Sequence, residues 1–166
     1  MKTASCSNCE KLADVVTQNY RFEEMGLPVE LRNIKVIRCS HCGNVDPIIP
    51  HMDSLLHILA MAVVCSPRKL SGEEVRFLRK YAGKSARDFA RFLHVDHTHL
   101  SKVENGKTEI GTRLDKLVRL LIVTMSPTLK DEVSKLLEMI PDIDDSCSEG
   151  DQEIQIDPAT RNYQYA

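Results

Sequence analysis

Four cysteines in the first 50 residues have a spacing that could hold a metal ion. They form two identical pairs, Cys6-x-x-Cys9 and Cys39-x-x-Cys42. Two thiolates separated by two residues can wrap around one ion, and two such pairs complete a tetrahedral site with Zn–S distances near ~2.3 Å. An all-thiolate cage favours Zn²⁺, with an iron–sulfur centre as the alternative. Because all four ligands come from the protein, no position remains for a substrate water, and we predict a structural metal.

Two other kinds of chemistry find less support in the sequence. A redox switch that ejects its metal needs a thiol of low pKa, and the sequence indicates no environment that would produce one. Histidines are concentrated at His94, His97 and His99. His97 and His99 fall on opposite sides of a predicted helix, so they cannot easily share an ion. Serine, histidine and aspartate residues are present, but none stands in a nucleophile motif, and we expect a protein that is not an enzyme.

A second functional stretch, residues 85–108, contains two short helical patterns joined by a tight turn at His94 and Val95. Ser85 can cap the first helix and Asp96 the second. The second helix is predicted to run to about Glu104 and to stop at the following Asn-Gly pair. The arrangement predicts two closely crossing helices, with the second one available to contact a ligand.

The second helix has one polar side and one largely apolar side when its residues are placed at ~100° intervals. The apolar side includes His99, Leu100 and Val103. The polar side carries His97, Thr98, Ser101 and Lys102. Short polar groups and a lysine on a helix are what the DNA major groove accepts. The alternative is an ordinary helical bundle whose polar side faces solvent.

These residues resemble the lambda-repressor-like (Xre-type) helix-turn-helix family. The resemblance rests on Ala90, on Val95 and on residues 100–107, which read LSKVENGK. It implies that Glu104 pairs with Arg79 on the preceding helix. One departure is Ala86, because many members carry a glutamine there that contacts the DNA backbone.

The resemblance also assigns roles at the DNA. Positions matching His97, Thr98 and Lys102 face base edges in this family, and the position matching Lys107 approaches a phosphate. With the remaining polar groups of the two helices, the predicted DNA-binding residues are Ser85, His97, Thr98, Ser101, Lys102 and Lys107.

The whole chain, residues 1–166, divides into four segments by composition. Residues 1–50 predict a β-rich module too small to stand without its metal. Residues 51–66 predict a helix that is apolar on all sides, buried between the two domains or against a second copy. Residues 67–140 predict five helices, and residues 141–166 an acidic mobile tail. The predicted fold class is α+β, a small β-rich four-cysteine zinc module followed by an all-α five-helix lambda-repressor-like DNA-binding domain.

The net charge of −2 conceals an uneven distribution along the chain. Residues 66–125 hold thirteen basic and seven acidic side chains, whereas residues 126–166 hold three basic and ten acidic ones. The positive segment coincides with the predicted helix-turn-helix, as binding to phosphates requires. We expect a cytoplasmic protein, since the N-terminus has no apolar core for a secretory signal.

The whole arrangement resembles the MqsA-type antitoxin family, also called YgiT-type zinc-finger/helix-turn-helix proteins. The two cysteine pairs, the Tyr20-Arg21-Phe22 stretch and residues 101–106 carry this resemblance, which covers roughly residues 1–125. It implies a homodimer that represses transcription from a palindromic operator in double-stranded DNA, with a zinc module that holds a toxin or serves structure. The alternative function is a protein-interaction module whose DNA binding is autoregulatory.

Overall fold

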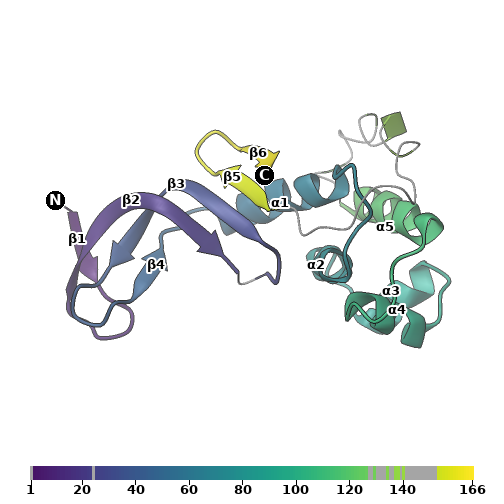
Figure 1. Cartoon of the computed structure of the whole chain (residues 1–166), viewed down its shortest axis with the longest axis horizontal. Coiled ribbons are helices and arrows are strands. Elements are labelled where there is room, and N and C mark those ends of the chain that lie inside the picture. Colours follow the sequence, from purple (N-terminus) through teal and green to yellow (C-terminus); the bar gives the residue numbers. More distant parts are fainter. Residues whose placement is uncertain are drawn as a thin grey trace.

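The computed structural model describes residues 2–23, 25–126 and 153–166, together with Leu129, Ser134, Leu137, Glu138 and Ile140. A twisted sheet lies at one end, a group of helices at the other, and α1 between them (Figure 1). The fold class is α+β, as predicted. The elements in chain order are β1 Lys2–Ser5, β2 Leu12–Phe22, β3 Val29–Arg38, β4 Val45–Pro47, α1 Met52–Val64, α2 Gly72–Tyr81, α3 Ala86–Phe92, α4 His97–Glu104, α5 Thr112–Met125, β5 Ile154–Asp157 and β6 Asn162–Tyr165.

The sheet is built on a long antiparallel hairpin of β2 and β3. The register runs from Asp14 opposite Arg38 to Phe22 opposite Val29, with an irregularity between Gln18 and Tyr20. Burial alternates along β3 on each side of an irregularity at Asn33, with Val29, Leu31, Ile34 and Val36 buried and the residues between them half-buried or exposed. Such alternation is what a sheet covered on one face requires. β1 pairs with the start of β2, and β4 pairs with the end of β3.

The two ends of this hairpin are packed differently. Near the chain start, the residues buried around the cysteines are few, namely Cys6, Ala13 and Cys39. Toward the helices, β3 contributes Val29, Leu31, Ile34 and Val36 to the main hydrophobic core. We call residues 2–15 and 37–47 the cysteine end of the sheet. The prediction that the β module lacks a core of its own therefore applies to the cysteine end, while the other end shares the core of the helices.

The C-terminal residues 153–166 form a hairpin that extends the same sheet. β5 pairs in parallel with β3, with Val29 opposite Ile154 and Leu31 opposite Ile156, and β6 pairs with β5. Both isoleucines are buried. The prediction of a mobile tail over residues 141–166 is thus wrong for residues 153–166, because the alternating isoleucines give β5 an apolar face that packs on the core. Residues 141–152 lie outside the described residues.

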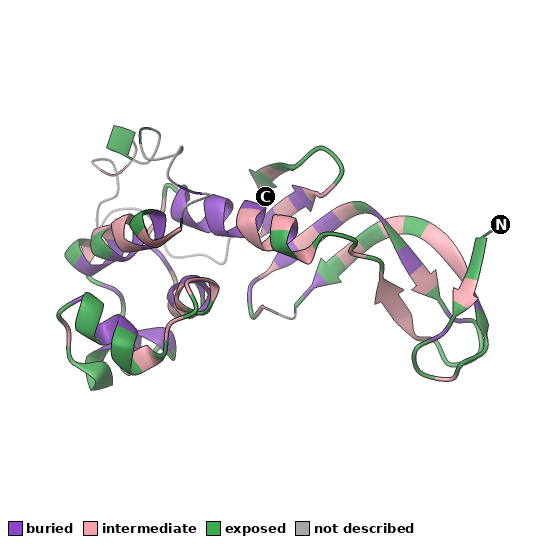
Figure 2. Cartoon of the chain, turned by 180° about the vertical axis from the view of Figure 1, so that it is seen from behind, coloured by how far each residue is buried: buried purple, intermediate pink, exposed green. Residues whose placement is uncertain are grey.

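Helix α1 is enclosed by elements of its own chain. Eight consecutive or near-consecutive residues between Leu55 and Val64 are buried. The helix contacts α2, β5 and β6, and Figure 2 shows its C-terminal half in the colour of buried residues. The Tyr165 hydroxyl donates a hydrogen bond to the Ala62 carbonyl at 2.5 Å. Of the two predicted environments for this helix, the structure therefore shows packing between the sheet and the helical domain.

Helices α2 to α4 begin at side-chain caps that the sequence indicates. Ser71 forms a capping box with Glu74 at the start of α2, Ser85 accepts from the Asp88 N–H, and Asp96 accepts from the N–H groups of Thr98 and His99. Each cap satisfies helix N–H groups that have no partner within the helix. The fifth helix that we predicted within residues 126–140 falls mostly outside the described residues. Among the helices that are described, none has the length and apolar character needed to cross a membrane.

Candidate nucleic-acid interface and metal centre

The four cysteines lie on two turns with the same backbone geometry. In the first turn the Cys6 carbonyl accepts from the Glu10 N–H at 3.0 Å, and in the second the Cys39 carbonyl accepts from the Gly43 N–H at 3.0 Å. Glu10 and Gly43 both have positive φ, 61° and 75°. The left-handed backbone conformation at Glu10 and Gly43 closes each turn, so that the two thiols of each turn lie on the same side.

The two turns bring all four sulfur atoms within 4.8 Å of one another. The Sγ atoms of Cys6 and Cys42 are 3.6 Å apart, and those of Cys9 and Cys39 are 3.5 Å apart. A tetrahedron with Zn–S distances of ~2.3 Å has S–S edges of about 3.8 Å. The donor set and its spacing therefore fit one tetrahedral metal ion, which would cross-link the β1–β2 turn to the β3–β4 turn.

Hydrogen bonding and crowding of the thiols have opposite effects on two of the cysteines. The backbone N–H groups of Cys42 and His41 lower the pKa of Cys39. The backbone at Lys11 lowers the pKa of Cys9, but burial and the neighbouring thiols outweigh it and raise that pKa to about 12. Four thiolates cannot share this volume without a cation, so metal binding must displace protons from the cluster.

A polar cluster outside the sulfur atoms joins the two turns. Ser7, between the first two cysteines, donates from its hydroxyl to Asp46 at 2.6 Å. The Asn44 amide donates to the same carboxylate at 2.9 Å and to the Ser7 hydroxyl at 3.2 Å. These bonds hold the two turns in a fixed relation, which is how outer residues orient metal ligands.

The outward side of α4 is exposed along its length. His97, Thr98 and Lys102 are exposed and Ser101 is half-buried, whereas Leu100, Val103 and Glu104 are buried. The exposed surface also includes α3, which lies beside α4 at the end of the molecule far from the sheet (Figures 1 and 2). The predicted reading edge of the helix is thus accessible to a ligand.

The structure corrects the position of His99, which we predicted on the covered side of α4. His99 is exposed. The buried arc of the helix runs from Val103 through Leu100 to Glu104, roughly 100° wide, and His99 lies about 40° beyond it. The polar surface of α4 therefore includes all three exposed side chains of its first turn, His97, Thr98 and His99.

An ion pair fixes the C-terminal part of α4 against α2. The Arg79 guanidinium donates to the two carboxylate oxygens of Glu104 at 2.6 and 3.0 Å. Both side chains are nearly covered. The helices also approach closely at Gly72, where a Cβ atom would lie 2.1 Å from the Val103 carbonyl oxygen. The ion pair and the glycine together set the orientation in which α4 presents its exposed side.

Residues 72–128 match a family model described as a helix-turn-helix domain. This segment is similar to helix-turn-helix domains. No curated protein and no solved structure matches the chain. The matched residues contain α2 to α5, so α3 and α4 form the helix-turn-helix unit, and α4 occupies the position of its second helix. In helix-turn-helix units that bind DNA, the second helix enters the major groove.

The helix-turn-helix domain keeps its positive charge after its internal ion pairs are discounted. Three buried or nearly buried pairs, Arg68–Glu74, Arg79–Glu104 and Arg119–Asp115, neutralise one another. Removing them from residues 66–125 leaves ten basic and four acidic side chains. The exposed basic residues are Lys80, Arg87, Arg91, Lys102, Lys107 and Arg113. This excess lies on the domain that carries the exposed α4.

Two of the predicted DNA-binding residues sit at the ends of the unit. Ser85 is exposed, and its hydroxyl both accepts from the Asp88 N–H and donates to the Asp88 carboxylate, so its hydrogen-bonding capacity serves the α3 cap. Lys107 is exposed directly after the α4 stop, where Gly106 has a φ of 65°. At the start of α4, the backbone N–H of His99 and the Thr98 groups lower the pKa of Asp96, which keeps that cap ionised.

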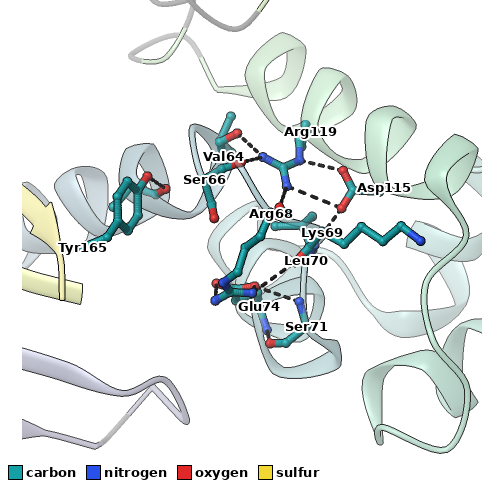
Figure 3. Close-up of polar contacts among 11 residues, drawn as sticks. Val64, Ser66, Arg68, Lys69, Leu70, Ser71, Glu74, Asp115, Arg119 and Tyr165 are labelled. Carbon is teal, nitrogen blue, oxygen red and sulfur yellow. Dashed lines mark hydrogen bonds and ion pairs between the residues drawn. The ribbon is translucent and has the colours of Figure 1, made fainter. Parts of the chain in front are cut away.

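Sequence reasoning missed a buried arginine that joins the helix-turn-helix domain to α1. Arg119 is fully buried and donates to Asp115 at 2.7 Å. It also donates to the carbonyls of Val64, Ser66 and Arg68, at 2.6–2.7 Å (Figure 3). The signal in the sequence is an aspartate and an arginine four residues apart on the apolar side of α5. These bonds fix the segment after α1 to the helix-turn-helix domain.

Proposed function

We propose that the protein is a sequence-specific DNA-binding repressor that reads its operator with α4. The single observation that carries this proposal is the exposed edge of His97, Thr98 and Lys102 on the second helix of a helix-turn-helix unit, opposite a buried edge held by the Arg79–Glu104 pair. Phosphate contacts would come from the surrounding basic residues, which position a protein on DNA, while side chains on α4 would distinguish bases.

The first test is binding to duplexes from the region upstream of the protein's own gene, followed by fluorescence anisotropy. Affinity should fall on the order of 10³-fold or more between about 50 and 200 mM salt if six or more phosphates are neutralised. Binding that is insensitive to salt would contradict the proposal.

Lys102 provides the residue-level test. Lys102→Ala should lower the discrimination between the correct and the wrong base at the position that Lys102 contacts by roughly 1–3 kcal/mol of binding free energy. Lys80→Ala, which removes one exposed charge from α2, is the matched control. An equal loss on every duplex tested would remove the role of Lys102 in base recognition.

We further propose that the protein acts as a homodimer on a palindromic operator. The two α4 helices of a symmetric dimer would enter major grooves one helical turn apart, ~34–36 Å. Sedimentation with a self-complementary duplex measures the stoichiometry, for which we expect two protein chains per duplex. One chain per duplex would contradict the dimer while leaving DNA binding intact.

The metal of the four-cysteine site is proposed to be Zn²⁺ with a structural role. A bound ion would supply a cross-link between the two turns and would carry out no chemical step. Metal analysis of the purified protein should give one zinc per chain, and the Cys42→Ser variant should bind it more weakly. A chain that retains iron and an absorbance typical of an iron–sulfur cluster would contradict this assignment.

A second candidate function is recognition of a protein partner, such as the toxin of an antitoxin-like pair. The observation that favours it is the cysteine end of the sheet, which projects away from the helices and exposes 73% of Leu12 (Figure 1). Co-purification with the product of a small neighbouring reading frame, lost in Leu12→Asp, would support this function. A neighbouring product that neither co-purifies nor affects growth would exclude a toxin partner.

A further inference from the structure

A side-chain contact between α2 and the end of α4 reaches the DNA-facing surface. The Arg76 Nη2 atom donates to the Glu104 carbonyl at 2.7 Å and to the Asn105 Oδ1 atom at 2.6 Å. Asn105 is the residue at which α4 ends. Arg76 thus links the supporting helix to a residue one turn beyond Ser101, which lies on the predicted reading side.

The contact fixes which way the Asn105 amide faces. A guanidinium group has only donors, so the amide atom beside Arg76 must be the carbonyl oxygen. The NH₂ group of Asn105 is therefore directed back along α4. It donates to the Ser101 carbonyl at 2.7 Å and lies 3.4 Å from the Ser101 hydroxyl oxygen.

The amide in turn restricts what the Ser101 hydroxyl can do. A serine hydroxyl ordinarily donates or accepts, and can therefore read either kind of base edge. Here the Asn105 NH₂ group occupies one of the two acceptor positions of the hydroxyl oxygen, at 3.4 Å, which directs the hydroxyl proton away from Asn105 and favours donation over acceptance. Around α4, Ser101 lies between the exposed His97 and Thr98, and the direction left for its proton includes the groove.

We propose that Arg76, acting through Asn105, is a positioning residue that biases Ser101 toward donating a hydrogen bond to the DNA bases. This inference rests on the proposed DNA-binding function. In the major groove guanine, adenine and thymine each present an acceptor, whereas cytosine presents only a donor. Ser101 should therefore select against cytosine at one base position of the operator.

The experiment is a selection from a library of random DNA duplexes with the full-length, metal-loaded protein. Ser101→Ala identifies the base position that Ser101 contacts. Compared with the wild-type protein, this variant should accept cytosine more readily at that position and at no other. The wild-type protein should disfavour cytosine at that position about fivefold to tenfold, the effect of one hydrogen bond. Asn105→Ala and Arg76→Ala should both admit cytosine there, since the released hydroxyl can turn to the carbonyl four residues earlier in the helix.

Two further variants separate positioning from general damage. Arg76→Lys keeps a donor for Asn105 and should retain the exclusion of cytosine, and Lys80→Ala removes a charge from the same helix and should leave that position unchanged. The inference is overturned if Ser101→Ala alters no base position. It is also overturned if Asn105→Ala or Arg76→Ala still excludes cytosine at that position, provided that thermal melting shows the variant to be folded. A wild-type protein that enriches no motif would instead overturn the proposed function itself.

Discussion

The two ends of the molecule are stabilised by different interactions. At the cysteine end, the buried residues are two of the cysteines and one alanine. Among the other residues that the structure describes, one hydrophobic core runs from the inner half of the sheet through α1 into the helix-turn-helix domain. Burial of apolar surface therefore stabilises the helical end, whereas the cysteine end depends on its thiols and on whatever ion they bind.

The difference explains why the two candidate sites have different requirements. Reading DNA needs a helix held in one orientation, and α4 obtains this from a close approach to α2, an ion pair and buried apolar contacts. A cross-link between two turns needs only four ligands at the right separation. We therefore expect perturbations of the core to abolish DNA binding, and perturbations of the cysteines to act locally.

The largest expected effect comes from Arg119, at the centre of the helical end. Arg119→Ala leaves the buried Asp115 carboxylate without its ion-pair partner and three carbonyls without their arginine donor, and should lower the free energy of unfolding by ~3–5 kcal/mol. Urea denaturation followed by circular dichroism measures this change. Arg113→Ala, an exposed arginine on the same helix, should change stability by less than ~0.5 kcal/mol. Equal effects of the two variants would contradict the role of the buried network.

Removal of the metal should have a smaller, local effect. After treatment with a chelator, hydrogen exchange should accelerate in residues 2–15 and 37–47 while α1 to α5 stay protected, because the helical core does not include the cysteine turns. Cys42→Ser should reproduce this pattern, and Cys65→Ala, which replaces a buried cysteine in the helical end, should retain the metal. Loss of protection throughout the helices would show that the two ends are not independent.

The smallest expected effect concerns the C-terminal hairpin. Tyr165→Phe removes the hydrogen bond to the Ala62 carbonyl but keeps the ring, so we expect a loss of about 1 kcal/mol in unfolding free energy. Asn162→Ala, at an exposed position of the same strand, is the control. A change below the error of the measurement would mean that the hairpin is held by its isoleucines alone.

The features that sequence reasoning predicted are those in which the residues concerned are close together in the chain. The caps at Ser85 and Asp96 depend on groups two or three residues away, and the cysteine turns depend on a repeated four-residue pattern. The C-terminal hairpin was missed because Ile154 and Ile156 pair with a strand far away in the sequence. The position of His99 was missed because the width of the covered arc on α4 depends on the neighbouring helices.

The network of Arg119 shows the same limit. Its aspartate partner is one helical turn away and could have been inferred. Its three carbonyl partners lie at the end of α1 and in the segment after it, which only the folded chain brings near. The resemblance to a known helix-turn-helix family supplied the Arg79–Glu104 pair, which spacing alone does not indicate. Contacts between distant segments therefore had to come from the structure.

The central claim is that the protein binds DNA through the exposed edge of α4. The most direct measurement is an NMR titration of the isotope-labelled protein with a duplex that it binds. We predict that the largest shifts will fall on His97, Thr98, Ser101 and Lys102, with the cysteine end unchanged. Shifts concentrated at the cysteine end, or an α4 that does not respond while DNA is bound, would contradict the account.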